Sequence, residues 1–210
     1  MDTVEATEVR CYRGDIPGEY LALARNARVV AWDIETSGLD WRTDKIGTCQ
    51  LYIPGIAPVL VIIGNDLPHN LGTLVSEASI MKVFHHAMFD LRFMTYRWGV
   101  QAQNIACTKI AAKLINREDN SKNSLKLLLG HYLHVSIDKT SQKSDWLAPQ
   151  LSDAQIQYAV KDVLYLIELL SALEQDLGRC GLLELAHKCF AHIPTQVALE
   201  VMGYKDIYAY

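Results

Sequence analysis

The sequence predicts an α/β fold, with one domain built around a mixed β-sheet that is flanked by α-helices. Two observations predict it. Segments with strand character come mostly in the first half of the chain, and the second half is dominated by segments with helical periodicity. With 210 residues, half of them hydrophobic, the chain is long enough to bury one large core.

The clearest strand covers residues 29–35. It is nearly all apolar until its two acids, which is typical of a central strand covered on both faces. We expect further strands at residues 48–53, 58–63, 81–86 and 105–107, and turns at Gly47, Pro54, Gly55 and Gly64.

Helices are expected at residues 90–98, 108–115 and 124–133, followed by a long helix from about residue 152. Ser152 and Gln155 have the spacing of a capping box at its start. An apolar stripe follows, and Gly178 or Gly181 can end the helix. The stripe consists of Ile156, Val160, Val163, Ile167 and Leu170.

Composition excludes several classes of protein. The N-terminal residues lack the apolar core of a secretion signal, and no apolar run approaches the ~20 residues of a membrane span. Five cysteines without a C-x-x-C pair indicate reduced thiols, as in the cytoplasm. Four potential zinc ligands lie close together, but their spacing matches no common zinc site, so helix packing is the better interpretation. They are Cys180, His187, Cys189 and His192.

Charge is unevenly distributed along the chain. The net charge is −4, yet residues 109–143 carry seven Lys or Arg against three Asp or Glu. This pattern favours a local contact with phosphate over long-range attraction of a polyanion, although solvated helix faces often look the same.

Five residues form a pattern that none of them would establish alone. Asp33 and Glu35 share one face of a strand, although a strand end that meets solvent would look similar. Asp90 follows a second strand, where an ordinary helix N-terminal acid is also expected. Tyr158 and Asp162 lie four residues apart on one face of the late helix.

In this order the five residues resemble the DEDD superfamily of 3′→5′ exonucleases, in the subclass whose last motif carries tyrosine. Three sequence segments are similar to those of the ribonuclease D-like proteins: WDIETSGLD, FHHAMFDL and QKSDWLAPQLSDAQIQYAVKDVLYL. Residues 107–170 and the ending DIYAY look closest to the short, single-domain nanoRNase C family. The resemblance implies a ribonuclease H-like fold and one exonuclease domain over residues 1–210. Its catalytic core would cover about residues 27–180, and residues 190–210 would form a tail for packing or oligomerisation.

The resemblance also implies a mechanism. Clustered carboxylates need cations, and oxygen ligands suit Mg²⁺ or Mn²⁺. Asp33 would be shared by two such ions, and Glu35, Asp90 and Asp162 would complete the ligand set. Tyr158 would orient the attacking water, since its ordinary pKa near 10 makes it a poor base.

Substrate contacts are implied for six positions. Thr36 and Leu39 would hold the terminal nucleotide, with core packing as the alternative for Leu39. His85 would lie near the scissile nucleotide, or would be a structural histidine. The three remaining candidates lie in one polar loop that could close over phosphate: Gln142, Lys143 and Ser144.

The expected substrate is short RNA with a free 3′ end, trimmed down to dinucleotides and to nucleoside 5′-monophosphates. A DNA exonuclease with the same chemistry, a non-catalytic nucleic-acid-binding domain and a ribonuclease H-type endonuclease remain alternatives. The family resemblance further implies a homo-oligomer, with a ring-shaped octamer as the specific expectation.

Overall fold

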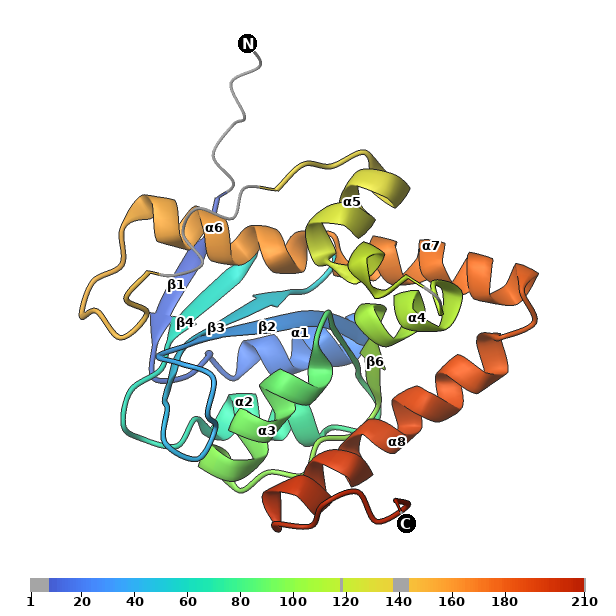
Figure 1. Cartoon of the computed structure of the whole chain (residues 1–210). Coiled ribbons are helices and arrows are strands. Elements are labelled where there is room, and N and C mark those ends of the chain that lie inside the picture. Colours follow the sequence, from blue (N-terminus) through green and yellow to red (C-terminus); the bar gives the residue numbers. More distant parts are fainter. Residues whose placement is uncertain (1–7, 118, 138–143, 210) are drawn as a thin grey trace.

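Six strands form one mixed sheet in the order β1-β4-β3-β2-β5-β6 (Figure 1). The computed structural model describes residues 8–117, 119–137 and 144–209. β2 pairs in parallel with β5, and β5 in parallel with β6, whereas β3 runs antiparallel to both β2 and β4. The edge strand β1 pairs in parallel with β4. The strands are β1 (Arg10–Arg13), β2 (Val29–Thr36), β3 (Ile46–Tyr52), β4 (Val59–Ile62), β5 (Met81–Phe84) and β6 (Ile105–Cys107).

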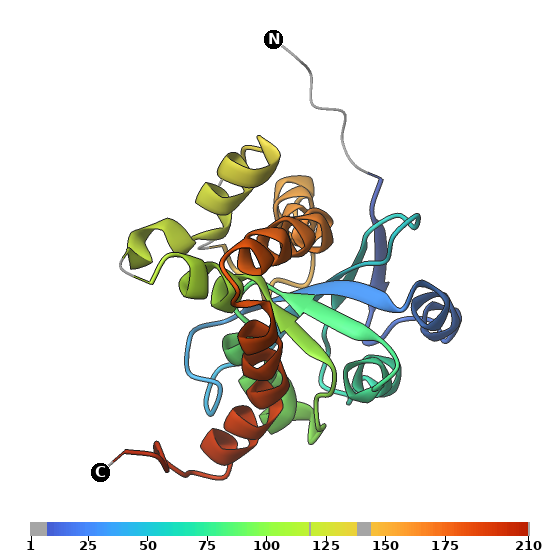
Figure 2. The same cartoon turned by 90° about the vertical axis from the view of Figure 1, so that its right-hand side faces the viewer.

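Helices cover both faces of this sheet. In Figures 1 and 2, α6 and α7 lie across one face, while α1, α2 and α3 lie on the other. The last helix, α8, packs against α3 and against the edge strand β6. The helices are α1 (Glu19–Ala27), α2 (His69–Ser76), α3 (Ala87–Trp98), α4 (Thr108–Ile115), α5 (Leu125–Leu133), α6 (Asp153–Leu164), α7 (Leu166–Arg179) and α8 (Leu183–Val201), with a 3₁₀ turn η1 (Asn120–Asn123).

The expected α/β class, the five strands and the three middle helices are confirmed. Ser152 begins α6 through the capping box with Gln155. One expectation was wrong: the long helix is two helices, because the backbone at Tyr165 leaves the helical region between α6 and α7. Gly181, with a φ of 69°, follows the end of α7.

Five elements were not predicted: β1, α1, α2, η1 and α8. β1 is short and mostly exposed, and α1 and α2 have only eight or nine residues, so none of them carries a strong periodic signal. Residues 190–201 continue α8, so the expected tail begins as packed helix, in which Phe190, Ile193 and Val197 are buried.

Two large aromatic side chains of the core come from the neighbouring strands β2 and β5. The rings of Trp32 and Phe84 stack there with centroids 6.1 Å apart. Lys82 is fully buried nearby, and its Nζ donates to the carbonyl oxygens of Glu77 and Ile80 at 2.7 and 2.8 Å. Among the described residues, no helix has the length and apolar character needed to cross a bilayer.

Candidate active site

Two strand residues and one helix residue bring their carboxylates to a single point. Asp33 and Glu35 project from β2, which pairs with β3 up to a bulge after Glu35. Asp162 approaches from α6, which crosses β2 and β3. Ligand oxygens of the three acids all lie within 4.8 Å of one another. The same-face spacing of two strand residues and the position of a capped helix therefore produce one acidic cluster.

The fourth acid, Asp90, lies on a third element, α3, and binds the backbone of β2. It lies in the first turn of α3, where the helix dipole favours a negative charge, and it is only 2% exposed. Its Oδ1 accepts a hydrogen bond from the backbone N–H of Ile34, between the two strand acids, at 3.2 Å. The fourth acid is thus tied directly to the strand that carries the first two.

Tyr158 lies one turn before Asp162 on α6 and is buried. Its ring packs against that of Trp146, with centroids 6.0 Å apart. A Cβ atom at Gly47 on β3 would overlap the backbone carbonyl of Trp146. Only glycine at this position lets the segment that holds Trp146 reach the sheet, and Trp146 in turn supports the tyrosine.

The cluster shifts the proton affinity of its members. Burial, and then the charges of Asp90, Asp162 and Glu35, hold the pKa of Asp33 well above its usual range. Burial, then Asp162 and Asp90, raises the pKa of Glu35 to about 8, and burial raises the pKa of Asp90 to about 7. These shifts favour the protonated acids, so full ionisation near neutral pH needs a cation that offsets burial and mutual repulsion. An all-oxygen, negatively charged site of this kind fits hard divalent cations.

These acids line a cavity of about 600 Å³. Of the six predicted substrate contacts, Thr36, Leu39 and Ser144 lie on its wall. Leu39 is 83% exposed, so the alternative of core packing was wrong. Gln142 and Lys143 fall outside the described residues.

The sixth candidate, His85, is not among the residues that line this cavity. The strand β5 ends at Phe84, and His85 turns towards the start of α4, where its Nδ1 lies 2.9 Å from Thr108 Oγ1. His86 lines the cavity instead, together with Phe89, and the two rings stack with centroids 6.1 Å apart. Their three-residue spacing at the start of α3 was the signal that could have identified this pair.

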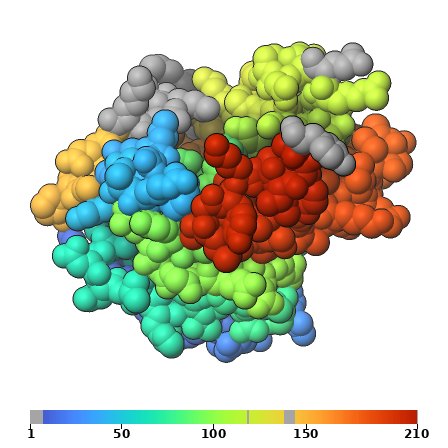
Figure 3. Space-filling model, turned by 60° about the horizontal axis from the view of Figure 1, so that its bottom comes forward, coloured from blue at the N-terminus to red at the C-terminus, as the bar shows by residue number. Residues whose placement is uncertain are grey.

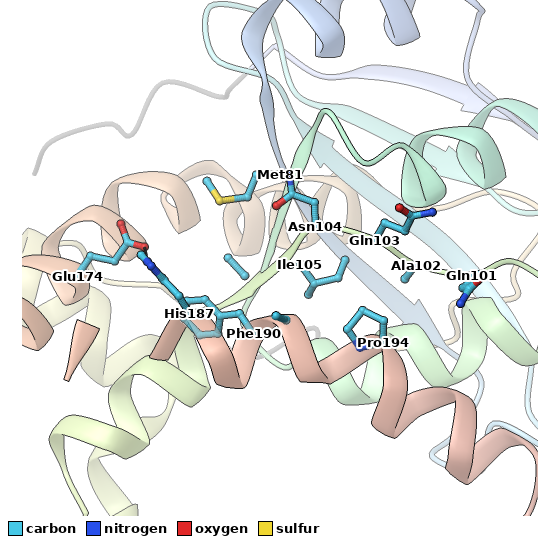
Figure 4. A pocket seen from close by; sticks show the side chains of 12 residues that line it. Met81, Gln101, Ala102, Gln103, Asn104, Ile105, Glu174, His187, Phe190 and Pro194 are labelled. Carbon is cyan, nitrogen blue, oxygen red and sulfur yellow. Dashed lines mark hydrogen bonds and ion pairs between the residues drawn. The ribbon is translucent and has the colours of Figure 1, made fainter. Parts of the chain in front are cut away.

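A second hollow of about 550 Å³ lies between residues 101–106 and α8 (Figure 4). It contains one acid–histidine pair, Glu174 and His187, whose nearest atoms lie 2.9 Å apart. Across the described residues, the three acids Asp33, Glu35 and Asp162 are the only potential metal-binding group of three or more His, Cys, Asp or Glu. Cys180, His187, Cys189 and His192 do not come together in such a group among the described residues. The chemistry of the lining, rather than the volume, distinguishes the acidic cavity.

Comparison with known families decides the identity. A family model described as "3′-5′ exonuclease" matches residues 14–178, which include all five residues of the predicted pattern. The chain belongs to the 3′-5′ exonuclease family. Its similarity to ribonuclease D confirms the expected DEDD, ribonuclease D-like assignment.

Curated relatives are longer than the exonuclease. Ribonuclease D of Haemophilus influenzae is 28% identical over 165 residues, which cover 77% of this chain but 40% of the relative. Ribonuclease D of Gluconacetobacter diazotrophicus is 33% identical over 157 residues, covering 72% of this chain and 39% of the relative. The exonuclease therefore spans about two fifths of the length of these two relatives.

A solved structure of similar length is that of Brucella melitensis NrnC. It is 37% identical, has a TM-score of 0.88, and the match covers 96% of this chain and 98% of that one. The same Brucella protein is known with bound Mg²⁺ and, separately, bound to pGG. These similarities confirm the ribonuclease H-like fold of the exonuclease.

Proposed function

We propose that the exonuclease hydrolyses short oligoribonucleotides from the 3′ end, including dinucleotides, and releases nucleoside 5′-monophosphates. The observation that carries the proposal is the convergence of three carboxylates within 4.8 Å at the base of a 600 Å³ cavity. A cavity of this size suits one or two nucleotides better than a long strand. The binding of pGG by Brucella NrnC supports a short substrate.

Asp33, Glu35, Asp90 and Asp162 are proposed to hold two divalent cations, Mg²⁺ or Mn²⁺, with Asp33 shared between them. The raised pKa of Glu35 and the burial of Asp90 support this ligand set, because charged acids need a cation there. Such cations, when bound, provide Lewis-acid assistance for hydrolysis of a phosphodiester. The Mg²⁺-bound form of Brucella NrnC supports the choice of metal.

Tyr158 is proposed to orient the attacking water. Burial, and then the charge of Asp162, raises the pKa of this phenol above its ordinary value. The phenol therefore stays protonated, and it acts by donating a hydrogen bond rather than by removing a proton. Its ring packs against Trp146, which supports a fixed orientation of the phenol.

Leu39 and the His86–Phe89 pair are proposed to contact the bases, and Thr36 and Ser144 the sugar–phosphate groups. Flat rings and an exposed leucine can pack against any base, so this lining does not select a sequence. Lys143 and Gln142 are retained as proposed phosphate contacts on the basis of the sequence alone.

The test is digestion of 5′-labelled RNA of two to ten nucleotides, with Mg²⁺, with Mn²⁺ and with EDTA. We expect stepwise 3′ shortening that requires a metal and is abolished by Glu35→Gln. Matched DNA oligomers test the alternative of a DNA exonuclease, which equal or faster DNA cleavage would support. Cleavage of circular RNA would indicate an endonuclease, and binding without cleavage would indicate a non-catalytic domain.

We also propose that the exonuclease is a homo-oligomer, as the family resemblance implies, with an octamer as the specific expectation. Four large apolar side chains at the C-terminal end are at least half exposed: Met202, Tyr204, Ile207 and Tyr208. They follow α8, whose red end lies on the face drawn in Figure 3, and a second subunit would cover them. Light scattering that gave a monomer mass would reject this proposal.

The remaining proposals concern organisation and location. We infer one exonuclease domain over residues 1–210, with its catalytic core at about residues 27–180. All five cysteines are free thiols, which supports a reducing compartment such as the cytoplasm.

A further inference from the structure

The segment of residues 37–45 joins β2 to β3 and carries Leu39 at the wall of the acidic cavity. A leucine that is 83% exposed is not held by core packing. It can present a fixed surface to a ligand only if the backbone around it is fixed by other contacts, since ordering a free loop on binding costs affinity. Those contacts determine whether Leu39 is a preformed part of the site.

Contacts within the segment form a closed ring. The Asp44 carboxylate accepts hydrogen bonds from Asp40 N at 2.9 Å and from Ser37 Oγ at 3.4 Å. Ser37 Oγ accepts in turn from Lys45 N at 3.0 Å. A Cβ atom at Gly38 would overlap the Asp44 carboxylate, so this carboxylate occupies the space beside Gly38. The ring fixes the shape of the segment but does not fix its position relative to the acids.

Arg97 of α3 fixes that position. Its Nη2 donates to the carbonyl oxygens of Arg42, at 3.2 Å, and of Asp44. Next to it on α3, the ring of Tyr96 meets that of Trp41 edge-on, with centroids 5.0 Å apart. Both bonds come from one guanidinium nitrogen, whose N–H directions are fixed by the planar group, whereas the ammonium of lysine rotates about its bond to the side chain.

The same helix carries a member of the acidic cluster. Asp90 and Arg97 are seven residues apart, which places them on one side of α3, about two turns or ~10 Å from each other. Asp90 binds the backbone of β2 through Ile34 N, and Arg97 binds the segment that follows β2. The rigid helix α3 therefore holds residues 37–45, and Leu39 with them, at a fixed distance from the acids.

We propose that Arg97 is a positioning residue for the terminal nucleotide. It holds Leu39 at a fixed distance from the acidic cluster, so that the terminal base contacts Leu39 while the scissile phosphate lies at the acids. This inference rests on the proposed function, in which Leu39 contacts the terminal base. The ligand is the 3′-terminal nucleoside of a single-stranded nucleic acid.

The test compares Arg97→Gln, Arg97→Lys, Leu39→Ala and the double variant Leu39→Ala/Arg97→Gln on a short RNA with Mg²⁺. We expect Arg97→Gln to raise KM roughly tenfold with a much smaller change in kcat, because binding loses a preformed surface. Lysine should restore part of the loss. The double variant should resemble Leu39→Ala alone, since Arg97 acts through Leu39. The matched control is Arg25→Gln, which removes an exposed arginine paired with Glu77 and should leave KM unchanged.

Amide hydrogen exchange provides a readout that does not depend on turnover. Arg97→Gln should speed exchange in residues 37–45 and leave β2 and α6 protected as in the wild type. If Arg97→Gln does not fold, Asp44→Asn loosens the same segment from within and is expected to raise KM in the same way. An unchanged KM, or losses that multiply fully in the double variant, would overturn the role of Arg97. A wild-type protein without nuclease activity would overturn the proposed function instead, and the exchange experiment would still decide whether Arg97 fixes the segment.

Discussion

Replacing Glu35 with glutamine should stabilise the metal-free protein at the same time as it abolishes hydrolysis. Glu35 is held near two other carboxylates, and its pKa is raised from 4.5 to about 8 by burial and by Asp162 and Asp90. Removing its charge therefore relieves repulsion and desolvation that the folded state otherwise bears.

The size and pH dependence of the effect follow from this pKa. A carboxyl group whose pKa is higher in the folded than in the unfolded state does not lower the free energy of unfolding at pH values below the unfolded pKa. The destabilisation grows as pH rises towards the folded pKa. A tenfold change in proton affinity is worth about 1.4 kcal/mol, so at pH 8 the upper limit is about 4 kcal/mol, against about 1 kcal/mol at pH 5. If Glu35→Gln recovers only half of this upper limit, the melting temperature should rise by roughly 4–8 °C for a chain of this length.

The assay is thermal unfolding of wild type and Glu35→Gln in EDTA at pH 5 and pH 8, and again with Mg²⁺ at pH 8. We expect the variant to melt higher than the wild type in EDTA at pH 8, and to differ little at pH 5. Mg²⁺ should raise the melting temperature of the wild type more than that of the variant, because the variant lacks one ligand. Glu184→Gln serves as the control, since this residue is highly exposed on α8 and surface changes are worth less than about 0.5 kcal/mol. Equal melting of variant and wild type in EDTA at pH 8, or a difference of the same size at pH 5, would refute the electrostatic reasoning.

Three further predictions concern single residues. Tyr158→Phe should lower kcat roughly 100-fold with little change in melting temperature, and an unchanged kcat would remove the phenol from the mechanism. Gly47→Ala should destabilise the fold by about 1–3 kcal/mol in urea unfolding, because its Cβ meets the Trp146 carbonyl. The matched change Gly178→Ala, in open space on α7, should be neutral or stabilising, and equal losses from both would contradict this explanation. Burial lowers the pKa of Lys82 from 10.5 to about 8, so its charge costs stability below pH 8 and the cost fades between pH 8 and 10.5. The stability of Lys82→Met relative to the wild type should therefore fall by up to about 3 kcal/mol across that range, and a constant difference would argue against a charged, buried Lys82.

Two pairs of residues in the acidic cluster could be predicted because local geometry places the members of each pair side by side. The two-residue period of a strand puts Asp33 and Glu35 on one side, and the four-residue spacing on a capped helix aligns Tyr158 with Asp162. The assembly of these pairs came from the order of motifs and not from any single pattern. Local patterns also defined the central strand and α6, whose capping box is present as expected.

What the sequence could not provide depends on contacts between distant segments. From the sequence, Arg97 is expected to be a solvated arginine at the end of a helix. In the structure it binds the carbonyl oxygens of Arg42 and Asp44. Gly47 reads as a turn residue, although it lies within β3 and is required by the approach of Trp146. The contact between His85 and Thr108, a partner 23 residues away, likewise could not be read from the sequence.

The distribution of the acids along the chain has a consequence for synthesis. A growing polypeptide that has delivered Asp33, Glu35 and Asp90 still lacks α6, and with it Asp162 and Tyr158. Strand β2 would meanwhile keep the face that α6 later covers open to water. Under the proposed function, hydrolysis would therefore await translation of α6, because a nascent chain that stops before Asp162 lacks part of the proposed ligand set.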